Sequence, residues 1–85
     1  MVNQLNQAYV SDNRRVNLIW ERVKRNLTPK QVAVELGVNP NSVRAWERGE
    51  WAPRYEHLMS LCQLYDADAR YLMATQQTTE GSDDA

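Results

Sequence analysis

The middle of the sequence, residues 27–51, encodes two short helices separated by a single turn. The first helix starts at a capping box, TPKQ, in which the Thr28 hydroxyl accepts a backbone N–H and the glutamine reaches back. Gly37 ends this helix, because glycine readily adopts the left-handed conformation that closes a helix. Asn39 caps the second helix, since asparagine is a strong N-cap and a residue before proline is extended. These signals predict helices over residues 29–36 and about 40–48.

Apolar spacing on either side of this pair predicts further helices. Asp12 is placed to cap a helix that runs to about Asn26. The apolar stripe of that helix consists of Val16, Leu18, Ile19, Trp20 and Val23. After the pair, residues 54–65 repeat apolar side chains at helical spacing, and Asp68 caps a last turn over residues 69–74. The sequence has no strand pattern and no repeat, so the expected fold class is all-α, with four to five short helices around one core.

A chain of 85 residues has room for one hydrophobic core, and therefore for one domain. We assign residues 12–74 to this domain. Residues 1–11, which are rich in Asn and Gln, are expected to form an N-terminal arm or a short extra helix. Residues 75–85 lack apolar periodicity and carry acidic side chains, which predicts a disordered acidic tail.

The formal net charge is −1, which is not typical of a protein that binds nucleic acid through bulk charge. The charge is unevenly distributed along the chain. Residues 12–65 hold nine Lys/Arg against six Asp/Glu, a net +3, whereas residues 66–85 hold one against five, a net −4. The acidity therefore lies at the C-terminal end, and most of the predicted helical region is basic.

Several functional classes lack the residues that they need. His57, expected on an exposed helix face, is the only histidine, and the sequence has no Gly-rich phosphate loop and no metal-ligand spacing. We therefore expect no enzyme, no cofactor and no metal site. Cys62 is the only cysteine, so an internal disulfide is excluded and the residue is expected to act as a small buried hydrophobe. No apolar run approaches the ~20 residues that span a bilayer and no secretory signal is present, so we expect a cytoplasmic location.

Two helices this short cannot bury a core by themselves, and DNA-reading proteins use such a pair to present the second helix to a groove. The sequence resembles the XRE family of helix-turn-helix proteins, the phage-repressor/Cro type, over roughly residues 16–73. The matching positions are Arg22, Leu27, Thr28, Gln31, Val32, Ala33, Leu36, Gly37, Val38, Asn39, Ser42, Val43, Trp46, Glu47, Arg48, Gly49, Pro53, Leu58, Leu61 and Leu72. The resemblance implies a lambda-repressor-like domain that binds double-stranded DNA as a homodimer on an inverted repeat. It also implies a transcriptional regulator, most simply a repressor, encoded by a bacterium or a phage.

The resemblance further implies which residues contact DNA. The N-terminal half of the helix over 40–48 would enter the major groove, with the outward positions Pro40, Asn41, Arg44 and Ala45 reading bases. Asparagine can pair with adenine, arginine with guanine, and the alanine or proline surface can meet a thymine methyl. Phosphate contacts are assigned to Thr28, Lys30, Ser42, Arg48 and Arg54. The dimer surface is assigned to Tyr71, Leu72 and Met73.

One acidic residue of the second helix is expected to be structural. Glu47 is predicted to point inward, where a charge without a partner is costly, and the resemblance pairs it with Arg22. The sequence departs from the family pattern at three positions. Glu21 stands where an apolar residue is usual, Pro40 where phage repressors often place a base-reading glutamine, and Asp66 where glycine is frequent. Proline has no donor, so the resemblance does not supply a preferred DNA sequence.

Other functions with the same fold stay open. The chain could be the antitoxin of a toxin–antitoxin pair, with DNA binding as autoregulation, or a module used only for protein interaction. Pro40 and the near-neutral net charge favour the interaction-only hypothesis, whereas the polar and basic side chains on one side of the helix pair oppose it. Trp51 could cover the core, stack near the DNA backbone or serve a protein interface, and we expect it to cover the core.

Overall fold

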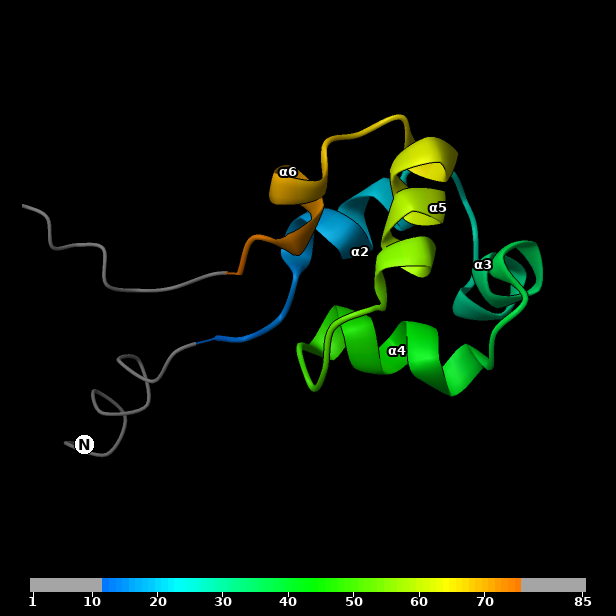
Figure 1. The fold of residues 1–85 in the computed structure, drawn as a ribbon, viewed down its shortest axis with the longest axis horizontal. Helices are drawn as coiled ribbons and strands as arrows, with labels where there is room; N and C mark the ends of the chain where they lie inside the picture. The colour runs from blue at the N-terminus through cyan, green and yellow to red at the C-terminus, as the bar shows by residue number, and fades with distance from the viewer. Residues whose placement is uncertain (1–11, 76–85) are drawn as a thin grey trace, which may run out of the picture.

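The computed structural model describes residues 12–75, which form five helices (Figure 1). These are α2 (Val16–Val23), α3 (Pro29–Leu36), α4 (Pro40–Arg48), α5 (Tyr55–Tyr65) and α6 (Ala69–Met73). The expected all-α class is confirmed. The predicted N-terminal arm, residues 1–11, and the tail from residue 76 onward lie outside the described residues. Within residues 12–75, no helix has the length and apolar character that crossing a membrane requires.

The bounds of α3 and α4 are those predicted from the caps. The Thr28 hydroxyl accepts a hydrogen bond from the Gln31 backbone N–H at 3.1 Å, and the Gln31 side chain accepts one from the Thr28 N–H at 2.8 Å. Gly37 closes α3 in the left-handed conformation, with φ at 71°. The Asn39 side chain then accepts a hydrogen bond from the Asn41 N–H at 2.8 Å and opens α4. The starts of both helices are therefore set by local polar contacts, and the end of α3 by a left-handed glycine.

Helix α2 starts later than predicted. Its N-cap is Arg15, and the Asp12 carboxylate instead accepts hydrogen bonds from the backbone N–H and the guanidinium of Arg14. The prediction that Asp12 caps this helix is therefore wrong, because the Asp12 carboxylate accepts its hydrogen bonds from Arg14 and not from the first turn of α2. The regular helix also ends at Val23 rather than near Asn26, which adopts the left-handed conformation with φ at 57°.

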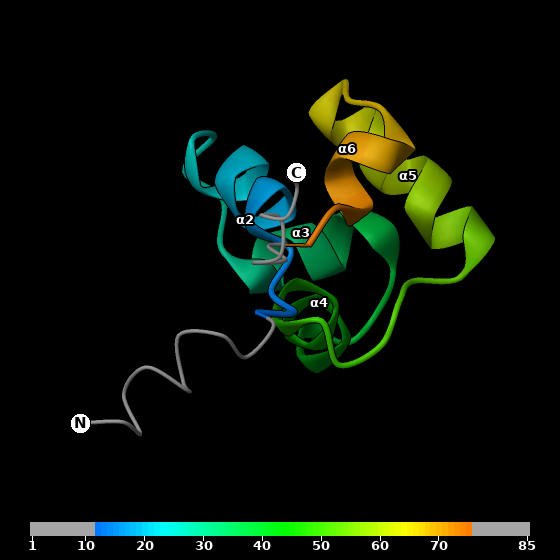
Figure 2. The ribbon, with the colours of Figure 1, turned by 90° about the vertical axis from the view of Figure 1, so that its left-hand side faces the viewer.

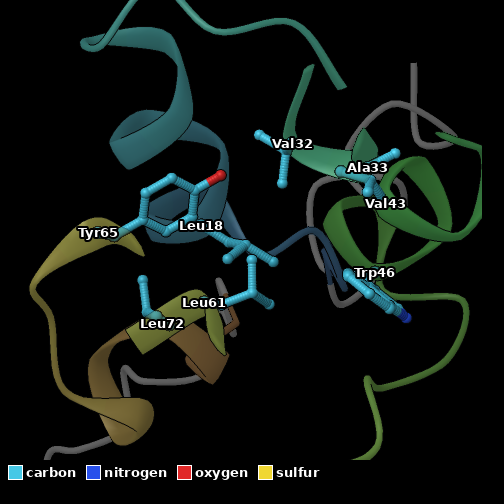
Figure 3. Packing of buried hydrophobic residues seen from close by; sticks show 8 residues of the cluster. All are labelled: Leu18, Val32, Ala33, Val43, Trp46, Leu61, Tyr65 and Leu72. Carbon is cyan, nitrogen blue, oxygen red and sulfur yellow. The ribbon is translucent and has the colours of Figure 1, made fainter. Parts of the chain in front are cut away.

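The core gathers side chains from all five helices. The buried cluster consists of Leu18, Val32, Ala33, Val43, Trp46, Leu61, Tyr65 and Leu72 (Figure 3). The small Ala33 is almost fully buried in α3, the helix that makes most of its contacts with α4. Not all of the predicted α2 stripe joins this cluster, since Trp20 is 54% exposed and Val23 is also exposed. Cys62 is half-buried and packs against the cluster, as a small hydrophobe would.

Helix α4 lies along one side of the domain in two perpendicular views (Figures 1 and 2). Its C-terminal end is held by the segment before α2, because the Arg15 N–H donates to the Glu47 carbonyl at 2.8 Å and the Arg15 guanidinium donates to the Trp46 carbonyl at 2.7 Å. Gly49 ends the helix with φ at 80°, and the Glu50 N–H returns to the Ala45 carbonyl at 2.9 Å. The C-terminal end of α4 is therefore fixed to the segment before α2.

Candidate nucleic-acid interface

Helix α4 has one buried face and one exposed face. Val43, Trp46 and Glu47 point into the domain, whereas Asn41, Arg44 and Arg48 are exposed. Pro40 and Ser42 are half-buried beside the exposed residues. An α-helix with this pattern packs its apolar face into the core and exposes its polar face at the surface.

The two polar residues assigned to base reading lie next to each other on this face. The Arg44 guanidinium donates a hydrogen bond to the Asn41 side-chain oxygen at 3.2 Å, one helical turn away. Both side chains are exposed. The pair is therefore an amide and a guanidinium on one continuous surface, and these are the groups that pair with the major-groove edges of adenine and guanine.

Ala45 does not share that surface. Only 1% of the residue is exposed, so the expectation that it points outward and meets a thymine methyl is wrong. The helix turns by 100° per residue, which places position 45 near Asn41 on the helix, so the burial of Ala45 comes from the chain around it, whose Glu50 N–H donates to the Ala45 carbonyl at 2.9 Å. The base-reading candidates that the structure leaves accessible are Asn41, Arg44 and the half-buried Pro40.

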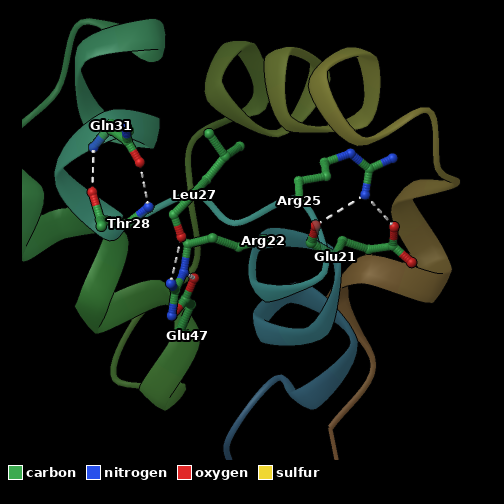
Figure 4. Close-up of polar contacts among 7 residues, drawn as sticks. All are labelled: Glu21, Arg22, Arg25, Leu27, Thr28, Gln31 and Glu47. Atoms are coloured by element: carbon green, nitrogen blue, oxygen red, sulfur yellow. Dashed lines mark hydrogen bonds and ion pairs between the residues drawn. The ribbon is translucent and has the colours of Figure 1, made fainter.

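The expected ion pair between Arg22 and Glu47 is present (Figure 4). Arg22 Nε lies 2.7 Å from Glu47 Oε2, and Nη2 lies 3.0 Å from Oε1. The remaining guanidinium nitrogen, Nη1, donates to the Leu27 carbonyl at 2.9 Å. This hydrogen-bonded partnership raises the pKa of Arg22 above its ordinary value. The pair joins α2 to α4 and so fixes the exposed face of α4 relative to the rest of the domain.

The residues assigned to phosphate contact lie on three elements. Thr28 and Lys30 are exposed at the start of α3, where the free N–H groups of a helix N-terminus favour an anion. Ser42 of α4 and Arg54, the N-cap residue of α5, both line a hollow of about 170 Å³. Arg48 is exposed at the end of α4 but is engaged by an acidic neighbour. The structure therefore brings Ser42 and Arg54 together.

Two aromatic residues of this hollow differ from their predicted placement. Trp51 is 55% exposed, so the expectation that it covers the core is wrong. His57 is half-buried rather than exposed, because its ring packs against Trp46 with the two centroids 5.8 Å apart. Trp46 belongs to the buried core cluster, whereas Trp51 lies exposed at the hollow that both residues line.

A buried acidic centre on α2 was not predicted. Glu21 is 6% exposed, and its carboxylate accepts hydrogen bonds from Arg25 at 2.7 Å and from the Tyr71 hydroxyl at 2.8 Å, with Lys24 Nζ at 3.1 Å. Arg25 first, and then the other donors, hold the pKa of this carboxyl at about 2. The spacing of Glu21 and Arg25 was visible in the sequence as an i, i+4 pair. The contribution of Tyr71, 50 positions away, was not.

The residues assigned to the dimer surface have different environments. Leu72 is 0% exposed and belongs to the core, so its assignment to a subunit interface is wrong. Tyr71 is exposed although its hydroxyl is bonded to Glu21, and Met73 is half-buried. Only these last two remain available to a partner.

The capped pair α3–turn–α4, with an exposed polar face on the second helix, defines a helix-turn-helix protein of the DNA-binding type. A family model described as helix-turn-helix matches residues 18–72. The chain belongs to this family, the XRE-type or lambda repressor/Cro-like helix-turn-helix proteins, which are DNA-binding regulators rather than enzymes. Comparison with curated proteins and with solved structures gave no match.

Proposed function

We propose that this protein is a sequence-specific transcriptional repressor that binds an inverted-repeat operator as a homodimer. The observation that carries the proposal is the exposed pair Asn41–Arg44 on α4, whose opposite face is locked by Val43, Trp46 and Glu47. In this reading α4 enters the major groove and the protein acts in the cytoplasm of a bacterium or a phage-infected cell. A rigid helix with exposed bidentate groups is suited to direct base readout.

The contacts to the DNA backbone would come from the ends of the neighbouring helices. Thr28 and Lys30 at the start of α3, and Ser42 with Arg54 at the hollow, would position the domain without reading sequence. Each phosphate that the protein neutralises adds about 0.9 to the slope of log affinity against log salt concentration. A half-site contacted in this way should give binding that falls steeply as salt rises.

We propose a dimer because one domain can contact only a short stretch of DNA. A single helix-turn-helix unit reads one half-site, and family members place two recognition helices one turn of DNA apart, about 34 Å. Tyr71 and Met73 on α6 are the described residues that we assign to the partner contact, since Leu72 is buried in the core. A repressor acts by occupying such a site next to a promoter.

The decisive experiment is selection of bound DNA from a random pool at about 50 mM salt, where electrostatic contacts are strong. We expect enrichment of a two-fold symmetric sequence, with half-sites about 10 bp apart. The same selection is repeated with Arg44→Lys, which keeps the charge but loses the bidentate fork. This variant should bind random DNA as the wild type does and lose about 1–3 kcal/mol of discrimination at one base pair of each half-site.

Two results would contradict the proposal. If wild type and Arg44→Lys enrich the same sequences, α4 does not read bases through this residue. If no DNA is retained at about 50 mM salt, a role in protein interaction alone is favoured. Retention of DNA together with co-purification of a small basic protein from the native host would instead identify an antitoxin.

A further inference from the structure

Arg48, one of the assigned phosphate ligands, is bound by a carboxylate from the residue that follows the helix cap. Arg48 Nε lies 2.7 Å from Glu50 Oε2, and Nη2 lies 3.2 Å from Oε1. Both side chains are about half exposed, so the pair lies at the surface at the end of α4. The pairing lowers the pKa of the Glu50 carboxyl below its ordinary value, because the guanidinium favours the ionised carboxylate.

The position of Glu50 is fixed by the backbone. Gly49 turns the chain back in the left-handed conformation, and the Glu50 N–H is bonded to the Ala45 carbonyl at 2.9 Å. A Cβ at position 49 would overlap the backbone carbonyl of Asn13, so the segment before α2 holds this turn from the other side. The carboxylate is thus kept within reach of Arg48 by the same turn that ends α4.

We propose that Glu50 attenuates the affinity of this protein for DNA by competing with a backbone phosphate for Arg48. The inference rests on the proposed function, because it assigns a role on the same DNA-binding surface. While the pair is formed, the guanidinium is neutralised and its fork is occupied by a planar anion that resembles the phosphate in hydrogen-bonding geometry. An exposed pair of this kind is weak, so a phosphate can replace the carboxylate.

The consequence concerns the affinity for all DNA, and not the ratio of operator binding to non-specific binding. Phosphate contacts strengthen binding to every sequence, whereas base contacts strengthen binding to the operator alone. A carboxylate that weakens one phosphate contact lowers affinity for operator and for random DNA by similar factors. Protein bound at non-specific sites, which are in large excess, then dissociates more readily. The base-reading pair Asn41–Arg44 contributes a larger share of the binding free energy at the operator.

The test measures DNA binding of wild type, Glu50→Gln, Arg48→Ala and the double variant, on a selected operator and on random DNA, between about 50 and 200 mM salt. Glu35→Gln is the matched control. It removes the same charge from an exposed residue of α3 that lies beside Ser60 and Gln63 of α5. Melting curves of all variants establish that they are folded.

We expect Glu50→Gln to bind both DNAs more tightly than wild type at about 50 mM salt, and to lose about threefold more affinity up to about 200 mM, as one added phosphate contact requires. Arg48→Ala should cost little in the wild type and clearly more in Glu50→Gln. The inference is overturned if Glu35→Gln gives an equal gain, if Glu50→Gln binds as wild type does, or if the gain is the same without Arg48. Failure of every variant to bind any DNA would instead overturn the proposed function on which the inference rests.

Discussion

Arg22 of α2 and Glu47 of α4 form a bidentate ion pair in which Nε and Oε2 are 2.7 Å apart. The same guanidinium donates to the Leu27 carbonyl, so the Arg22 side chain joins three segments: its own helix α2, the loop that precedes α3, and helix α4. Glu47 is 6% exposed, and a carboxylate in that position needs a charged partner. The orientation of α4 within the domain therefore depends on an interaction on its buried face.

Removal of this carboxylate should destabilise the fold strongly. In Glu47→Ala the Arg22 guanidinium, whose side chain is only 15% exposed, loses two of its hydrogen bonds. We expect a loss of about 3–5 kcal/mol in the free energy of unfolding, as is typical when one partner of a buried pair is removed. Urea denaturation measures the change. Glu50→Ala is the control, because its partner Arg48 is exposed, and its midpoint should stay close to that of the wild type. Equal effects of the two substitutions would contradict the structural role of Glu47.

The two glycines that close α3 and α4 should tolerate alanine differently. Both adopt positive φ, 71° at Gly37 and 80° at Gly49, which costs an L-residue about 1–2 kcal/mol. An alanine at Gly37 has nothing within 4 Å of its Cβ, whereas at Gly49 it would overlap the Asn13 backbone. We therefore expect Gly49→Ala to lower the melting temperature well beyond Gly37→Ala. A similar decrease in both would show that the segment containing Asn13 does not hold the end of α4.

Local signals account for what could be predicted from the sequence. The caps at Thr28 and Asn39 and the left-handed turn at Gly37 depend on contacts between residues at most four apart, so the bounds of α3 and α4 could be read directly. The Arg22–Glu47 pair joins residues 25 positions apart and was accessible only through the resemblance to the family. Local physics and family pattern together were sufficient for the helix-turn-helix unit.

Several of the errors arise where a residue distant in the sequence decides the placement of a side chain. Helical periodicity assigned Trp20 to the core and did not foresee that Glu21, the next residue, is the one buried. The Glu21 carboxylate is paired with Arg25 and Lys24 nearby in the sequence and also accepts a hydrogen bond from Tyr71 of α6, a contact that spacing does not reveal. Trp51 was expected to cover the core, but it is 55% exposed and lines the same hollow as the buried Trp46. Neither the burial of Glu21 nor the exposure of Trp51 can be recognised from the spacing of residues along the chain.

The placement of Leu72 can be tested by its effect on unfolding. The residue is 0% exposed and packs in the core, so Leu72→Ala should leave a cavity and cost about 2–5 kcal/mol. Because the loss lies within one protomer, it should be the same at every protein concentration. Met73→Ala is the control from the next position, because its side chain is only half-buried and its removal should cost less unfolding free energy than that of Leu72. A cost for Leu72→Ala that disappears at low concentration would place the residue in a subunit interface instead.

The acidic centre at Glu21 should make stability depend on pH in a defined window. Its donors hold the folded-state pKa at about 2, below the ordinary value of 4.5. A carboxyl with a depressed pKa stabilises the fold fully above its unfolded value, and this contribution is lost as pH falls toward the folded value. We expect the free energy of unfolding of wild type to exceed that of Glu21→Gln by a constant amount above about pH 5. The difference should shrink steadily between pH 4.5 and about 2.

Comparison with Tyr71→Phe separates the hydroxyl from the basic partners. This variant removes one neutral donor to Glu21 and leaves Arg25 and Lys24 in place, so the carboxyl pKa should rise only part of the way toward its ordinary value. Because Arg25 supplies the largest part of the shift, Arg25→Gln should move the pH window upward more than Tyr71→Phe does. Urea denaturation at a series of pH values from 7 down to about 3 measures both effects. A difference between wild type and Glu21→Gln that stays constant over this range would show that ionisation of Glu21 is not coupled to folding.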